Sequence, residues 1–456
     1  LKGLVIMSAI INNSFRKYNA DNFISSISSN KVYLMIGKKE PWANADLGQY
    51  VETSPSDIDV PVPIDTTVSQ YIHYNEMIAA KLINSTSVSH VLKRVDWTSG
   101  TVYPEYNQYT DDIIDTDFFV FTDAFRVYKC ISNYGGVQST IQPTGTSTGI
   151  IETSDNYRWK FMFEVQQSDV LKFVTTDWIP VNSPANASAQ VEQKAVEDAA
   201  VVGALEHIAI TSGGALYKSH TAQGQAGTST SITLAATASA TDDYYNAMTV
   251  YISDGVGSGQ IRTISDYDGT TKIATVSSAW TTNPDGTSVY EAMPAITLTP
   301  QAGDTPLGTG AVARVSGVTS GVITKVSMVS VGTNYRFLTA VVTSGMASGG
   351  TAAVLAARTS PPGGHGKNAV SELGGAFVML NIRLIGNEGT DFPIDDDFRK
   401  VHLVANPTAG GSAATGSTYN NTELDQDSGS IIYTEFRGPI VRASDSTEDI
   451  KLVCEF

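Results

Sequence analysis

The chain has 456 residues, of which 16 % are charged, and its formal net charge is −17. This length can bury sizeable cores without metals or disulfides, and the acidic balance argues against a nucleic-acid-binding protein, because phosphate neutralisation needs a surplus of Lys and Arg. Two cysteines, Cys130 and Cys454, exclude a disulfide framework, and two reduced thiols are the simplest interpretation. No segment has 18 consecutive apolar residues, so membrane insertion is not expected.

The first 205 residues form a mixed segment in which strands predominate. Since Met7 precedes a more convincing beginning, we expect Leu1–Ile6 to be a dispensable leader. Apolar and aromatic runs bounded by Gly, Pro, Asn and Asp predict strands at 32–36, 118–121, 125–131 and 157–165. Apolar residues at 3.6 spacing predict helices at 20–28, 67–83 and 188–202, the second opening with a capping box at Thr67–Gln70.

The composition changes at about residue 206, where Gly, Ala, Ser, Thr and Val become dominant up to about residue 360. Short β-branched runs alternate with turn signals at intervals typical of a β-sandwich or small barrel. The segment Asp266–Lys272 between two alternating runs predicts a hairpin. The region reads as one sandwich or as two small modules, near 215–298 and 299–358.

After residue 361 the composition resembles that of the first segment again. Strands are expected at 377–384, 401–404, 431–435 and 450–456. The sequence therefore predicts a mainly β protein with a few helices, in the α+β class. We expect a β-sandwich scaffold made of 1–205 and 361–456. This scaffold is interrupted by an inserted β-sandwich or barrel region at 206–360.

The sequence matches some catalytic and cofactor-binding motifs by letters, but the structural context that each motif needs is not expected around it. Gly145–Gly149 matches a nucleophile elbow by letters, but no buried strand precedes it and no helix is expected after it. Gly308–Ala313 matches a dinucleotide fingerprint but is not followed by a helical pattern. His365 is a possible ligand or general base, or simply a hydrogen-bonded loop histidine. The acidic runs 111–117 and 395–397 lack the pattern of a calcium loop. We expect no catalytic residue, cofactor, metal or small-molecule substrate.

Several short sequence blocks occur in a fixed order at the two ends of the predicted scaffold, and together they identify a family more specifically than any single block does. Near the start they are Ser8–Arg16, Asn22–Ile27, Val32–Trp42, Arg94–Trp97, Tyr103–Pro104, Phe125–Cys130 and Asp155–Glu164, and near the end Gly429–Ile440 and Glu448–Phe456. Their order and spacing resemble the baseplate wedge protein family (gene product eight) of T-even-like contractile-tailed phages. The resemblance covers most of 7–180 and about 425–456, with weaker support across 370–405. The segment 206–360 departs from the family's shorter form.

The resemblance implies a mostly β structural protein, not an enzyme. It also implies a homodimer that contacts other baseplate wedge proteins in the tail baseplate of the virion, after assembly in the host cytoplasm. Trp, Tyr and Arg are enriched at interface hot spots, and five such residues lie in or beside loop-like blocks. These candidate interface residues are Arg16, Trp42, Trp97, Tyr103 and Arg437. The alternative for Trp42 and Trp97 is that they close the hydrophobic core.

Two other classes stay open from the sequence. The chain is an adhesin if 206–360 presents Tyr267, Trp280 and Tyr290 to a host cell-surface glycan. It is a polysaccharide depolymerase if two carboxylates that are distant in the chain meet around a glycosidic bond.

Overall fold

The computed structural model describes residues 13–37, 74, 77–107, 116–303, 305–383, 397–419, 423–426, 428–441 and 449–455. The chain divides into two compact units, each built from separate segments: unit 1 from Leu1–Arg94, Val165–Asn182 and Leu373–Phe456, and unit 2 from Val95–Glu164 and Ser183–Glu372. Both expected boundaries, 205/206 and 360/361, lie inside unit 2, and independent folding of 206–360 stays a prediction. The expected leader Leu1–Ile6 lies outside the described residues.

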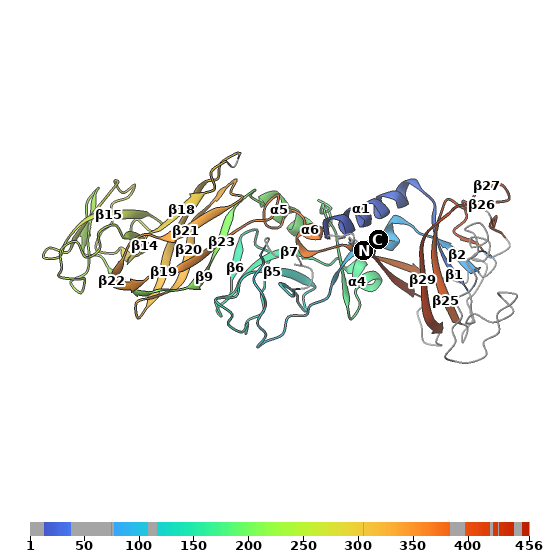
Figure 1. Ribbon diagram of the computed structural model, residues 1–456, viewed down its shortest axis with the longest axis horizontal. Helices are drawn as coiled ribbons and strands as arrows, with labels where there is room; N and C mark the ends of the chain where they lie inside the picture. The colour runs from blue at the N-terminus through green and yellow to red at the C-terminus, as the bar shows by residue number, and fades with distance from the viewer. Residues whose placement is uncertain are drawn as a thin grey trace, which may run out of the picture. The chain divides into compact units, whose positions relative to one another are not determined.

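The expected fold class is confirmed, since strands dominate and the helices are few (Figure 1). Unit 1 contains two antiparallel sheets. The five-stranded sheet has the order β28-β2-β1-β25-β29, with β1 at Val32–Gly37, β2 at Met77–Leu82, β25 at Asp397–Ala405, β28 at Thr418–Tyr419 and β29 at Ser430–Val441. The four-stranded sheet has the order β30-β24-β3-β8, with β3 at Val88–Lys93, β8 at Trp178–Val181, β24 at Phe377–Arg383 and β30 at Asp449–Glu455.

One hydrophobic core joins these two sheets to helix α1, Asn13–Ser29. Ala20, Phe23 and Ile27 recur every three or four residues on α1 and bury one face of the helix, as the sequence predicts for 20–28. Strand β1 is buried throughout, because alternate side chains enter this core and a second one. A shorter helix, α4 at Gln167–Phe173, places Phe173 in a third core with β3 and β24.

The expected helix at 67–83 is wrong at its C-terminal end. Residues 67–73 lie outside the described residues, but Met77–Leu82 form strand β2, which pairs antiparallel with β1 at Leu34↔Lys81. The sequence Met-Ile-Ala-Ala-Lys-Leu satisfies both periods locally. Pairing with β1 decides the outcome, because tertiary contacts override weak helix propensity.

The first part of unit 2 is a four-stranded antiparallel sheet in the order β4-β5-β7-β6. Its strands are β4 at Phe119–Phe121, β5 at Arg126–Ser132, β6 at Ile150–Glu152 and β7 at Arg158–Glu164. Helix α5, Val191–Ala199, lies within the expected 188–202 and contributes Val196 to the aromatic core of this sheet. The short helix α6, Ala369–Leu373, was not expected from the sequence.

The rest of unit 2 consists of antiparallel ribbons nested one inside another. The ribbon pairs are β9 at Leu205–Ser212 with β23 at Val354–Thr359, β10 at Ala215–Tyr217 with β22 at Met346–Thr351, β18 at Ile296–Pro300 with β21 at Leu338–Val342, and β19 at Thr309–Thr319 with β20 at Val322–Thr333. In the outermost ribbon Leu205 lies opposite Thr359. The ends of the inserted region are therefore adjacent.

A seven-stranded antiparallel sheet with its own core is inserted in the chain between β10 and β18, so the β10–β22 ribbon encloses it. Its strands are β11 at His220–Gln223, β12 at Ala226–Gly227, β13 at Ser231–Thr233, β14 at Thr249–Asp254, β15 at Ile261–Asp268, β16 at Ile273–Val276 and β17 at Val289–Met293. The hairpin expected at 266–272 is confirmed, since β15 pairs with β16 and Asp268 Oδ1 accepts the turn N–H groups of Thr270 and Thr271.

Candidate functional site

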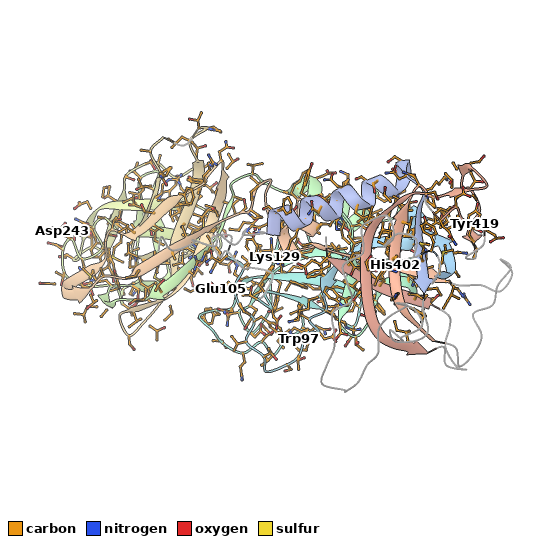
Figure 2. All side chains as sticks on the ribbon, turned by 45° about the vertical axis from the view of Figure 1, so that its right-hand side comes forward. Trp97, Glu105, Lys129, Asp243, His402 and Tyr419 are labelled. Atoms are coloured by element: carbon orange, nitrogen blue, oxygen red, sulfur yellow. The ribbon has the colours of Figure 1, made fainter. Side chains whose placement is uncertain are left out.

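Three of the five predicted interface residues can be placed with their side chains. Arg16 lies on α1 with its side chain 36 % exposed and pairs with Glu455 Oε1 at 3.0 Å. Trp97, labelled in Figure 2, is partly buried and packs against the aromatic core of unit 2. Tyr103 is only 2 % exposed and belongs to that core. Packing of Trp97 and Tyr103 therefore favours a structural role inside unit 2.

The two other interface candidates cannot be compared in this way. Trp42 lies outside the described residues, and Arg437 lies on β29 at a position where only the strand is described. Whether any of the five residues contacts a partner stays a prediction.

A polar network holds the loops around Trp97. Its Nε1 donates to Ser139 Oγ at 3.1 Å, and Ser139 Oγ donates to Asp155 Oδ2 at 3.2 Å. Burial alone favours the protonated form of Asp155, but hydrogen bonds from the Thr153 hydroxyl and from backbone N–H groups outweigh it and hold the pKa of this carboxyl below its ordinary value. The Asp155 carboxylate thus fixes the loop at 139–141 by accepting hydrogen bonds from its backbone N–H groups.

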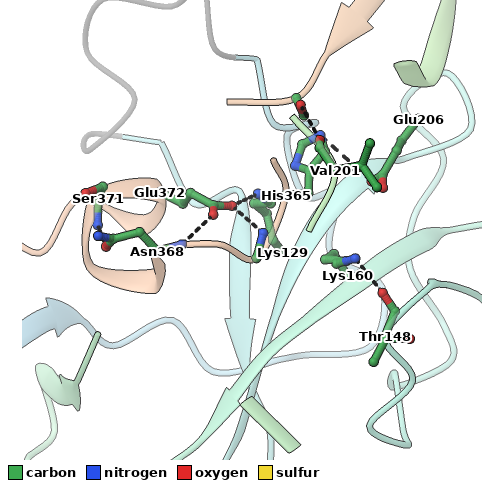
Figure 3. Close-up of polar contacts among 11 residues, drawn as sticks. Lys129, Thr148, Lys160, Val201, Glu206, His365, Asn368, Ser371 and Glu372 are labelled. Atoms are coloured by element: carbon green, nitrogen blue, oxygen red, sulfur yellow. Dashed lines mark hydrogen bonds and ion pairs between the residues drawn. The ribbon is translucent and has the colours of Figure 1, made fainter. Parts of the chain in front are cut away.

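Unit 2 also contains a buried cluster of charged residues, drawn in Figure 3. Lys129 on β5 is fully buried and forms an ion pair with Glu372 on α6. Glu372 Oε2 also accepts the N–H of Gly366 at 2.9 Å, and Oε1 accepts the N–H of Asn368 at 3.1 Å. Lys160 on β7, 2 % exposed, donates to the carbonyl oxygen of Thr148 at 2.6 Å. Both lysines are therefore engaged inside the protein.

The loop before α6 places His365 beside this cluster. Gly364 has φ +102°, and a Cβ there would lie 2.7 Å from the backbone N of Val201, so this close approach requires glycine. His365 is 4 % exposed, its ring lies edge-on to Tyr106, and its Nε2 is 4.0 Å from Glu206 Oε2. Burial, and then the charges of Lys129 and Lys160, hold the pKa of His365 well below its usual value.

The charged groups of this cluster bond to one another and to the backbone, so they cross-link segments of unit 2 that are distant in the sequence. Burial raises the pKa of Glu206 and lowers that of Lys129, so the interior disfavours charge except where a partner is present. Among the residues that the structure describes, no group of three or more His, Cys, Asp or Glu could hold a metal ion. Residues 111–115 and 395–396 of the acidic runs lie outside this part of the chain.

Sequence reasoning missed Lys129 and Lys160, although the sequence carries a signal for them. Each lysine interrupts an apolar strand run, Val-Tyr-Lys-Cys-Ile for Lys129 and Trp-Lys-Phe for Lys160. A lysine in such a run is buried only when it is paired. The run thus predicts a buried partner, but the sequence cannot identify Glu372, which lies 243 residues away.

A cleft of 390 Å³ opens in another part of unit 2. Its walls come from the ends of β5 and β7, from β9 and from β20. The apolar part of the wall includes Ile208, Ile210 and Ile323, and the polar part includes Glu105, Asn156 and Arg158. The cleft is a concave site that sequence reasoning did not find, because its walls meet only in the folded chain.

Glu105, labelled in Figure 2, is the carboxylate in the wall of this cleft. Its Oε1 accepts from Ser132 Oγ at 3.2 Å and from the N–H of Asn133 at 3.1 Å, and lies 3.3 Å from His207 Nε2. Burial favours the protonated acid, but these neighbours outweigh it and hold the pKa of Glu105 below its ordinary value. The cleft therefore presents an anionic acceptor at neutral pH.

The alternative in which three aromatic side chains of the insert face a glycan is wrong for those three residues. Tyr267, Trp280 and Tyr290 are 1 %, 5 % and 0 % exposed and belong to the core of the seven-stranded sheet. The alternation of the strands directs these large rings inward, because a small sheet needs aromatic volume to fill its core.

Other expectations have plain outcomes. Cys130 and Cys454 form no disulfide, as the expectation of two reduced thiols requires, and both are buried. In the described part of the chain, no helix has the length and apolar character needed to cross a membrane.

No known protein family profile matches the chain. Over 216 residues the chain is 24 % identical to the baseplate wedge protein gp8 of Enterobacteria phage T4. The match covers 40 % of this chain and 62 % of the phage T4 protein, so the chain spans less than two thirds of that relative's length. The similarity is distant and partial, and it agrees in kind with the resemblance in the sequence blocks.

Proposed function

We propose that this chain is a structural subunit of a phage tail baseplate wedge. The observation that carries the proposal is the 24 % identity to a baseplate wedge protein over 216 residues. The proposed subunit forms a homodimer, contacts other wedge proteins, and works during assembly and tail contraction. It resides in the tail baseplate of the virion and in the host cytoplasm during assembly.

The arrangement of charged groups in unit 2 supports a non-enzymatic role. The ion pair of Lys129 and Glu372 and the bond from Lys160 to a backbone carbonyl use these groups inside the fold. A subunit that transmits force needs layers that do not deform, and buried charge-assisted contacts between strands and helices supply cross-links between sequence-distant segments.

The location is tested by imaging the virions. Virions are labelled with an antibody Fab fragment against this chain and imaged by cryo-electron microscopy. The label is expected at the baseplate. A label on the capsid, or virions without label while the lysate contains the protein, refutes the location. An antibody against a known capsid protein is the control for access.

The homodimer is tested separately. Light scattering coupled to gel filtration is expected to give a mass about twice 48.5 kDa at micromolar concentration. A stable dimer should bury about 2,000 Å² or more in total. A chain that stays monomeric over the whole accessible concentration range contradicts the dimer but leaves the location test unaffected.

A further inference from the structure

We propose that the cleft in unit 2 binds one ring of an uncharged saccharide. Its volume of 390 Å³ lies near the lower end of the range of about 300–1,000 Å³ for small-molecule sites, which suits one sugar ring with its water. This inference is independent of the baseplate proposal, since it concerns ligand binding in one cleft and not contacts between protein subunits.

The polar wall of the cleft has hydrogen-bond donors and acceptors that other described residues do not use. Glu105 Oε1 is held by its neighbours, but Oε2 accepts no hydrogen bond from the described residues. Arg158 Nη1 donates to the carbonyl oxygen of Glu206 at 3.1 Å, and the other guanidinium nitrogens have no such bond within the described part of the chain. His207, 7 % exposed, is already engaged with the carboxylate, since its Nε2 lies 3.3 Å from Glu105 Oε1. Sugar hydroxyls both donate and accept, so they match a wall with both kinds of group.

The charges of the wall favour a neutral ligand. Among the residues that line the cleft, Glu105 is the one carboxylate, and Arg158 and Lys325 are the fixed cations. Lys325 Nζ is already paired with Glu152 Oε1 at 2.7 Å. The negative charge of Glu105 and the positive charge of Arg158 then balance. Glu105 would repel a polyanion and Arg158 would repel a polycation.

The rim supplies an aromatic face. Tyr134 lines the cleft, is 37 % exposed, and sits in a turn with φ +54°. Asn156, also in the lining, has φ +65°. Left-handed conformations of non-glycine residues persist only where the surroundings fix them, so the backbone that carries the ring and the amide is held in place before a ligand arrives. An aromatic ring with an apolar face packs against the C–H face of a pyranose.

The test is saturation-transfer NMR on the full chain with methyl glycosides of glucose, galactose, mannose and N-acetylglucosamine. We expect at least one of them to receive saturation, with a Kd of about 1 mM or somewhat weaker, as is typical of a few exposed hydrogen bonds and one stacking contact. Glucuronate and glutamate serve as charged comparison ligands and are expected to bind less well.

Two variants remove the recognising groups. Tyr134→Asn keeps a residue type that tolerates the left-handed turn and removes the ring. Glu105→Gln keeps the shape and removes the charge. Each is expected to weaken binding about tenfold or more. The matched controls are Tyr18→Asn on α1, where the tyrosine is 62 % exposed, and Glu192→Gln on α5, and both should leave binding unchanged.

Three results overturn the proposal: no saturation of any neutral glycoside, saturation of the charged compounds alone, or equal weakening in the controls. Because Tyr134 is exposed, Tyr134→Asn decides the question even if Glu105→Gln lowers the thermal midpoint.

Discussion

Breaking the buried ion pair between Lys129 and Glu372 should destabilise unit 2 strongly. Lys129→Met removes a fully buried ammonium group and leaves the Glu372 carboxylate, 2 % exposed, without its counter-charge. Removing one partner of a buried pair costs about 3–5 kcal/mol, and the lost contact of Lys129 Nζ over the Tyr106 ring, at 4.3 Å, adds to this cost. Such a loss is a large part of the 5–15 kcal/mol that stabilises a typical domain.

The double variant Lys129→Met with Glu372→Gln distinguishes charge burial from general damage. A glutamine keeps one oxygen for the N–H of Asn368 but gives up the acceptor that the N–H of Gly366 uses. We therefore expect the double variant to recover most of the loss and to remain about 1–2 kcal/mol below the parent.

The assay is urea unfolding followed by tryptophan fluorescence, to which Trp159 in the aromatic core of the same sheet contributes, with calorimetry to check that unit 2 unfolds in one step. Lys194→Met is the control, because Lys194 forms an exposed pair with Asp198 on α5 and should change stability little. The reasoning fails if Lys129→Met stays within about 1 kcal/mol of the parent, or if the losses of the two single variants simply add in the double variant.

Two further predictions concern the same unit. The pKa of His365 lies well below 6.5 in the folded chain, so its contribution to stability is present above about pH 6.5 and is lost as the pH falls, by up to about 1.4 kcal/mol per pH unit. His365→Asn should flatten this slope in urea unfolding between about pH 7.5 and 5.5, and an unchanged slope would assign it to other groups. Excision of 222–290, with Thr221 joined to Glu291 by Asn-Gly, should leave a folded protein by circular dichroism, because these two residues lie opposite each other in β11 and β17; aggregation of the product would show that the seven-stranded sheet is needed for the rest of unit 2.

The sequence predicts what depends on local pattern and misses what depends on distant pairing. The helix around Phe23 and the hairpin before Lys272 follow from period and turn chemistry, and both are present. The segment Met77–Leu82 fits helix and strand alike, and only the neighbouring strand β1 decides between them.

The candidate sites show the same limit. Lys129 stands out in an apolar run, but its partner comes from a helix 243 residues away. Glu105 has no local signal at all, because the walls of its cleft come from four strands that only folding brings together. Tyr267, Trp280 and Tyr290 look like surface aromatics in a polar region, yet the small sheet uses them to fill its interior.

The nested ribbons show how one chain can combine a compact scaffold with so long an insertion. Leu205 lies opposite Thr359 in the outermost ribbon, and His220 lies opposite Ala292 where the chain enters and leaves the seven-stranded sheet. At each level the inserted segment leaves and returns on adjacent antiparallel strands, so the host strands keep their register whatever lies between them. Since an antiparallel pair needs only a two-residue turn to close, we expect the host strands to fold with a short connection as well as with a whole extra module.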